Sequence, residues 1–116
     1  MSNSPIDEDA LLDLVDGDRD FLASLVETFR ADCAAYLDAI RKAVDTDNAE
    51  ALRQKAHGLK GAAANMQAEA VRAAAHRLEE LGRAGGLNQA PEALQRLEAA
   101  VDRLMPALEA LSEEES

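Results

Sequence analysis

A chain of 116 residues is long enough for one domain with one hydrophobic core. Its formal net charge of -11 at pH 7 argues against nucleic acid and anionic membranes as main ligands, because both are bound through basic surfaces. Aromatic residues make up only 3% of the chain and Trp is absent, whereas alanine and leucine are abundant. This composition predicts an all-α fold that packs through small and aliphatic side chains.

The N-terminal part of the chain predicts a tail, a short helix and a long helix. Residues 1–5 are expected to form a disordered tail, and residues 6–15 a first helix with acidic side chains in its first turn, where they suit the helix dipole. Gly17 ends this helix, and Asp18 is a suitable N-cap for a second helix over about residues 19–45. Apolar residues recur there at steps of three and four, and so share one face: Leu22, Leu25, Val26, Phe29, Cys33, Leu37, Ile40 and Val44.

The middle of the chain predicts two further helices. A turn is expected at residues 45–47, where Asp47 stands three residues before Glu50, the spacing of a capping box. A third helix then covers about residues 49–66 and a fourth about residues 68–83. Their core positions are Ala49, Leu52, Ala56, Leu59, Ala63 and Met66 in the third helix, and Val71, Ala74, Leu78 and Leu81 in the fourth. Three glycines are expected to end the fourth helix and open a loop: Gly82, Gly85 and Gly86.

The C-terminal part predicts a last helix that Pro91 begins and Pro106 disturbs. Proline suits a first helical turn, and the apolar seam that follows consists of Leu94, Leu97, Val101, Leu104, Leu108 and Leu111. Pro106 falls inside this seam, so a kink or break is expected near Met105. Residues 112–116 are expected to form an acidic disordered tail. Residues 6–111 are thus predicted to form one domain, an antiparallel up-down four-helix bundle with a short N-terminal capping helix.

The cysteine content, the hydropathy and the charge pattern indicate the compartment and the kind of partner. Cys33 is the only cysteine, so no internal disulfide can form. There is no apolar run of membrane-spanning length and no signal peptide, which favours a cytoplasmic protein without a membrane partner. Residues 51–77 contain five basic residues and only one acid, Glu69, in an otherwise acidic chain. A partner with an acidic pocket or a phosphate is therefore expected rather than DNA.

One histidine of the third helix is expected to face solvent among small and basic residues. At 100° per residue, His57 points about 140° away from the core direction of this helix. The residues on the same side, one turn or so before and after it, are Arg53, Lys60, Gly61 and Ala64. We therefore expect an exposed imidazole between two cations, with bare backbone one turn further on.

The two glycines beside this histidine are costly and so call for a reason. Gly58 and Gly61 each cost about 1 kcal/mol relative to alanine in a helix interior, and the chain uses alanine freely elsewhere. A residue without a Cβ lets another molecule approach the imidazole, and Lys60 can meet negative charge there. These features suit the receipt and release of a phosphoryl group. The alternatives are a solvated surface histidine and glycines that permit close helix packing, a reading that fits Gly58 better than Gly61.

Residues 57–61, HGLKG, resemble the His-x-Leu-Lys-Gly signature of the histidine phosphotransfer (HPt) domains of bacterial two-component phosphorelays. The resemblance extends over nearly the whole chain, from the capping helix through the bundle to a later stretch that contains Leu78, Glu79, Gly82 and Arg83. It implies that His57 is the phosphoacceptor, attacking through Nε2. It also implies that Lys60 helps to hold the phosphoryl oxygens and that Gly61 leaves room for the partner.

The resemblance implies further roles on the next helix. Glu79 stands where the family places a Gln or Glu that accepts a hydrogen bond from the imidazole Nδ1, which would fix the tautomer and raise the basicity of Nε2. In the chemotaxis-kinase branch a histidine at the spacing of His76 joins the same polar network. The alternatives are a solvated helix charge for Glu79 and a plain surface histidine for His76. One departure is Gln67, where the family often has a second glycine; it leaves the end of the third helix open.

The function implied by the resemblance is that of a phosphorelay carrier. A phosphorylated receiver-domain aspartate would donate to His57, and a second receiver would accept from it, so the expected partners are receiver domains and a hybrid sensor histidine kinase. The carrier is expected to be a monomer with no cofactor of its own, since the receiver supplies Mg²⁺. No glycine loop follows a strand, which argues against an ATP site and hence against a kinase. The Glu-x-x-His motifs of di-iron bundles are also absent, so no metal site is expected.

Two other functions are compatible with a helical bundle of this kind. It could grip a kinase or receiver without carrying phosphate, but the intact His57, Lys60 and Gly61 argue against this. It could instead be the substrate domain of a chemotaxis-type kinase, phosphorylated by an ATP-bound kinase domain rather than by a receiver. The initial methionine and the acidic C-terminal residues favour a free-standing protein over that alternative.

Overall fold

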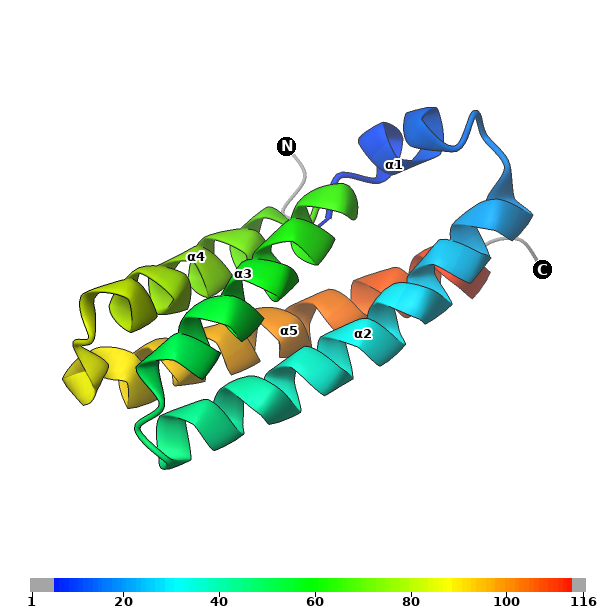
Figure 1. Ribbon diagram of the computed structural model, residues 1–116. Helices are drawn as coiled ribbons and strands as arrows, with labels where there is room; N and C mark the ends of the chain where they lie inside the picture. Colours follow the sequence, from blue (N-terminus) through cyan, green and yellow to red (C-terminus); the bar gives the residue numbers. More distant parts are fainter. Residues whose placement is uncertain (1–5, 114–116) are drawn as a thin grey trace.

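Four long helices lie side by side in the computed structural model, which describes residues 6–113, with side chains as far as Leu111 (Figure 1). They are α2 (Arg19–Asp45), α3 (Ala49–Asn65), α4 (Glu69–Ala84) and α5 (Ala90–Glu113). The short helix α1 (Glu8–Leu14) lies at one end of them, and a 3-10 turn (Leu87–Gln89) links α4 to α5. Every element in this part of the chain is helical, which confirms the all-α prediction.

The long helices form a closed arrangement in which each packs on the next. Successive long helices run in opposite directions, because the connections between them are short (Figure 1). Helix α3 packs most extensively on α4 and then on α2, and α5 packs on both α4 and α2. Helices α3 and α4 are therefore the most closely associated pair, and the site described below lies between them.

A continuous leucine-rich core holds these helices together. Each long helix contributes fully buried side chains, among them Leu22, Ile40, Leu52, Leu59, Leu78, Leu97 and Leu104. Burying one such side chain contributes about 1.5–3 kcal/mol, more than helix propensity supplies at any one position. The predicted apolar seams are thus largely the buried faces, although Leu25, Val44 and Leu94 are only partly buried.

The predicted N-terminal cap is right for α2 and wrong for α3. The Asp18 carboxylate accepts a hydrogen bond from the Phe21 N–H at 3.0 Å, so the predicted N-cap of α2 is confirmed. The predicted capping box of Asp47 and Glu50 is wrong. Asn48 is the N-cap of α3, because Asp47 adopts a left-handed conformation (φ 52°) in the turn and Asn48 receives the capping bond from Ala51.

Two further expectations concern residues within helices. Gly85 ends α4 in a left-handed conformation (φ 74°), as expected, but Gly82 is a buried residue inside α4 and not a terminator. Of the kink or break expected near Met105, the break does not occur, because α5 continues through Pro106 to Glu113. Pro106 is exposed and lies outside the buried seam, so the carbonyl that it deprives of a partner, that of Asp102, belongs to an exposed residue.

Near the two ends of the chain, the observed helix bounds differ slightly from the predicted ones. Helix α1 begins after the N-cap Asp7 and is shorter at both ends than the predicted range of 6–15. Ser112 and Glu113 continue α5, beyond the predicted end of the domain at residue 111. The other residues of the two predicted tails, 1–5 and 114–116, lie outside the described residues. None of the described helices has the length and apolar character needed to cross a membrane.

Candidate functional site

The outward-facing side of α3 carries an exposed imidazole. The His57 side chain is 65% exposed, while Ala56 and Leu59 beside it in the sequence are fully buried. The direction predicted from helical rotation is therefore confirmed. His57 lies in the middle of a regular helix whose core face is packed on its neighbours, so its backbone position is fixed while its ring remains accessible.

A buried carboxylate from α4 holds one edge of this imidazole. Glu79 is only 2% exposed, and its Oε2 lies 3.0 Å from Nδ1 of His57. An ionised carboxylate can only accept, so Nδ1 carries the proton and donates it to Glu79. The other ring nitrogen, Nε2, is then unprotonated in the neutral ring and carries a lone pair.

The carboxylate is held in its ionised form by a lysine from α3. Nζ of Lys60 lies 2.6 Å from Oε1 of Glu79. The hydrogen bond from Lys60 keeps the pKa of Glu79 below its ordinary value, with a smaller contribution from His57, although burial acts in the opposite direction. A buried carboxylate that kept its charge without such partners would be costly.

An arginine that the sequence analysis did not place in the site completes the surroundings of Glu79. Nη2 of Arg83 lies 3.1 Å from Oε2, the oxygen that also accepts from His57. Arg83 is four residues after Glu79 on the same helix, which is the spacing at which side chains meet on a helix surface. That spacing was visible in the sequence, but only the burial of Glu79 makes the contact important.

The remaining predicted site residues lie nearby with looser contacts. His76 is on the edge of the network, with Nδ1 3.8 Å from Oε1 of Glu79 and Nε2 3.5 Å from Oε1 of Glu80. Arg53 pairs with Glu50 at 2.7 Å and not with Glu79. Ala64 and Gly61 are exposed, and a Cβ on Gly61 would meet no atom within 4 Å. Gly61 therefore borders open space, and its role as a point of approach stays a prediction.

The second glycine of the motif has a different environment. A Cβ on Gly58 would lie 2.5 Å from Cε1 and 2.8 Å from the hydroxyl oxygen of Tyr36 in α2. The missing side chain thus makes room for the Tyr36 ring against the α3 backbone, next to His57. This is the close-packing alternative that the sequence left open for Gly58. Tyr36 had no signal of its own in the sequence, since only the packing of α2 on α3 brings it here.

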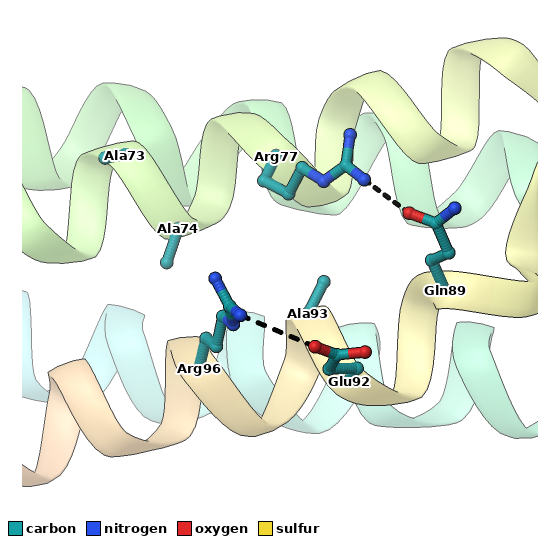
Figure 2. A pocket seen from close by; sticks show the side chains of 7 residues that line it. All are labelled: Ala73, Ala74, Arg77, Gln89, Glu92, Ala93 and Arg96. Carbon is teal, nitrogen blue, oxygen red and sulfur yellow. Dashed lines mark hydrogen bonds and ion pairs between the residues drawn. The ribbon is translucent and has the colours of Figure 1, made fainter.

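A separate groove lies between α4 and α5, with a volume of about 420 Å³. Figure 2 shows Ala73, Ala74 and Arg77 on the α4 side of this groove and Ala93 and Arg96 on the α5 side. Arg77 bonds Gln89, and Arg96 pairs with Glu92 at 3.4 Å. Arg77 is two residues before Glu79 and so points about 200° away from it around α4. The groove is therefore on the other side of α4 from His57 and forms no part of its site.

The other groups with ligand or nucleophile chemistry are not assembled into a site. Cys33 is buried in the core, and burial raises the pKa of its thiol to about 11, so it is a poor nucleophile at neutral pH. Among residues 6–111, no three His, Cys, Asp or Glu side chains are grouped so that they could share a metal ion.

The comparisons with known proteins show the family and the fold. Residues 24–107 match the family model of the Hpt domain, and the chain therefore belongs to the Hpt domain family. The structure is similar to the crystal structure of histidine-containing phosphotransfer protein B (HptB) from Pseudomonas aeruginosa PAO1. The TM-score is 0.90 at 27% sequence identity, over 97% of this chain and 98% of that one. No curated protein matches the chain.

Family and fold together define the class of protein. The chain is a histidine phosphotransfer protein of the kind that acts in phosphorelays, where Hpt proteins carry phosphoryl groups between kinases and receiver domains and are not themselves kinases.

Proposed function

We propose that His57 accepts a phosphoryl group from a receiver-domain aspartate and passes it to the aspartate of another receiver. The observation that carries the proposal is the contact of Nδ1 with Glu79 at 3.0 Å, on a ring that is otherwise 65% exposed. The contact supports a proton on Nδ1, which would leave the lone pair of Nε2 for attack. The only other histidine, His76, has looser contacts with its neighbouring acids, at 3.8 and 3.5 Å, and so lacks this orientation.

The transfer step follows from these positions. The Nε2 lone pair attacks phosphorus, the N–P bond forms, and the bond from phosphorus to the aspartate oxygen breaks, so that a carboxylate leaves. The ring gains positive charge in this step, and the Glu79 carboxylate stabilises it through the Nδ1 proton. The second transfer is the reverse of the first, with a different aspartate as the acceptor. The Mg²⁺ needed to neutralise the aspartyl phosphate is supplied by the receiver, and the carrier needs no cofactor of its own.

In this proposal the Lys60 ammonium contacts both the Glu79 carboxylate and the phosphoryl group. In the free protein its ammonium contacts Glu79 at 2.6 Å, but it is 24% exposed and lies one turn from His57, so it can also reach a phosphoryl oxygen. A lysine has three N–H donors, which allows it to keep the carboxylate and bind the incoming group at once. Gly61 leaves the approach to Nε2 open.

The receiver docks on the side of α3 that carries His57 and on the adjoining parts of α2 and α1. Among residues 6–111, the large apolar side chains that remain exposed are Leu14 at 59%, at the end of α1, and Phe21 at 52%, at the start of α2. Basic residues flank His57 and suit the acidic pocket of a receiver, in contrast to the acidic remainder of the chain. The partners are receiver domains and a hybrid sensor histidine kinase, met transiently by a monomeric carrier in the cytoplasm through a small interface.

The test is incubation with phosphorylated receiver domains, using the wild type, His57→Gln and His76→Gln. We expect acid-labile, base-stable label on the wild type and on His76→Gln, and none on His57→Gln. Equal label on His57→Gln would show that the wrong histidine was chosen. No label from several receivers, together with label from an ATP-bound chemotaxis-type kinase, would support the substrate-domain alternative. No label from either source would support the alternative of a binding module that carries no phosphate.

A further inference from the structure

Gly82 lies where α4 packs directly against the backbone of α3. A Cβ at this residue would lie 2.7 Å from the backbone nitrogen of Arg53, 2.8 Å from the carbonyl oxygen of Ala49 and 3.0 Å from the Cα of Arg53. Carbon atoms in contact prefer separations of about 3.5–4.0 Å. The atoms that it would meet belong to the backbone of a helix, so they cannot rotate away as the end of a side chain could.

This crossing is one turn away from the contact between Glu79 and His57. Gly82 is three residues after Glu79 on α4, and Arg53 is four residues before His57 on α3. Because the two helices run in opposite directions, the pair of positions 82 and 53 follows directly on the pair 79 and 57 along the interface (Figure 1). The separation of the helices at Gly82 is therefore nearly the separation that the Glu79 side chain must span.

The hydrogen bond between Glu79 and His57 tolerates little change in the separation of α3 and α4. The bond from Nδ1 of His57 to Oε2 of Glu79 is 3.0 Å long, near the upper end of the usual range of about 2.7–3.2 Å for N–H···O hydrogen bonds. Relief of the contacts of a Cβ at position 82 would move the helices apart by about 1 Å. Glu79 is 2% exposed, and its Oε2 also accepts a hydrogen bond at 3.1 Å from Arg83 on its own helix, which restrains the carboxylate from following the imidazole on α3.

We propose that Gly82 is a positioning residue of the phosphotransfer site, which sets the separation of α3 and α4 so that Glu79 reaches Nδ1 of His57. The inference rests on the proposed roles of His57 and Glu79. It gives the glycine of α4 a function in the chemistry of α3, although Gly82 does not itself touch the imidazole.

The experiment compares Gly82→Ala with Gly86→Ala. Gly86 is a matched control because a Cβ there would meet no atom within 4 Å and its φ of -91° is ordinary. Two quantities are measured: the tautomer of His57 by nitrogen NMR on the unphosphorylated protein, and the rate of phosphotransfer from a phosphorylated receiver. We expect Gly82→Ala to lose the preference for the Nδ1–H tautomer and to slow transfer by about tenfold or more, whereas Gly86→Ala changes neither.

A double variant separates positioning from general damage to the fold. If Gly82 acts through Glu79, adding Gly82→Ala to Glu79→Ala slows transfer no further. A further slowing in that background would overturn the inference. So would an unchanged tautomer and rate in Gly82→Ala, or loss of its helical circular dichroism, since the glycine would then serve the whole bundle. A wild type that takes no phosphate would contradict the proposed function instead, while the NMR comparison would still test the role of Gly82.

Discussion

The ammonium of Lys60 and the carboxylate of Glu79 lie 2.6 Å apart and link α3 to α4 beneath the imidazole of His57. The family resemblance implied that Lys60 acts on the phosphoryl group, whereas in the free protein its contact is with the acid that orients the ring. The pair therefore fixes the state of the site before any phosphate arrives. Lys60 keeps Glu79 charged, and Glu79 keeps the proton on Nδ1.

Removing the Lys60 side chain should destabilise the protein as well as slow phosphotransfer. Lys60→Met leaves a buried carboxylate without its nearest cation, at a cost of about 1–3 kcal/mol in the free energy of unfolding. Lys55→Met, at an exposed lysine of the same helix, is the control and should change stability little. Urea unfolding of both variants measures the difference. Equal stabilities would show that Arg83 and His57 suffice to hold Glu79.

The free energy of unfolding should depend on pH through the ionisation of Glu79. Its pKa is lower in the folded protein than the ordinary value of about 4.3 for the unfolded chain. The folded state therefore binds fewer protons, so this contribution to stability is fully present above about pH 4.3 and is lost as the pH falls through the lower folded pKa. We expect the stability difference between the wild type and Glu79→Gln to shrink between pH 5 and pH 3 (about one unit to either side of that value). A difference that stays constant over this range would mean that Glu79 titrates normally.

The sequence predicted most of the fold because the bundle is built on a regular apolar repeat. The bounds of α2 follow from Asp18 and from the recurrence of large apolar residues, and both are local. The same holds for the exposure of His57, which needs only the helical rotation from Ala56 and Leu59.

The wrong predictions concern residues whose environment depends on a neighbouring helix or on a backbone angle. Gly82 resembled a terminator because glycines follow it at 85 and 86, and its contact with the α3 backbone has no trace in one dimension. Tyr36 was missed for the same reason. Arg83 was missed because only the burial of Glu79 makes its i,i+4 contact important. Asn48 caps α3 only because Asp47 takes a positive φ, a choice that depends on the whole turn.

The two glycines of the motif should respond oppositely to alanine. A methyl group at Gly61 meets open space, so Gly61→Ala should raise the free energy of unfolding by about 0.5–1 kcal/mol, the usual gain of alanine in a helix. Phosphotransfer should nonetheless slow, because the methyl group stands on the approach to His57. Thermal unfolding and transfer rates on the same samples test both parts. A variant that is more stable and transfers at the wild-type rate would contradict the role of Gly61.

Gly58→Ala should lose that gain because its methyl group must displace the Tyr36 ring. The Cβ would lie 2.5 Å from Cε1, so the ring has to leave its place between α2 and α3. Truncating the ring should restore the gain, so that Gly58→Ala is more favourable in a Tyr36→Ala background than in the wild type. A double-mutant cycle of unfolding free energies measures the coupling. Additive effects would show that Tyr36 moves aside at no cost.

The turn after α3 offers a change that should alter stability alone. Gln67 has a φ of 57° at the position where the family often has glycine, and a side chain in this left-handed region costs about 1–2 kcal/mol. Glycine relieves that cost but loses about 0.5–1 kcal/mol through the greater freedom of the unfolded chain. We therefore expect Gln67→Gly to stabilise the protein by about 0.5–1 kcal/mol. Gly85→Ala, at a φ of 74°, should destabilise it.

Neither substitution should change the rate of phosphotransfer, because Gln67 and Gly85 lie outside the contacts of His57 and Glu79. Chemical unfolding gives the sign of each effect, and transfer assays on the same preparations check that the site is intact. A destabilised Gln67→Gly would mean that the Gln67 side chain makes interactions worth more than the strain it carries.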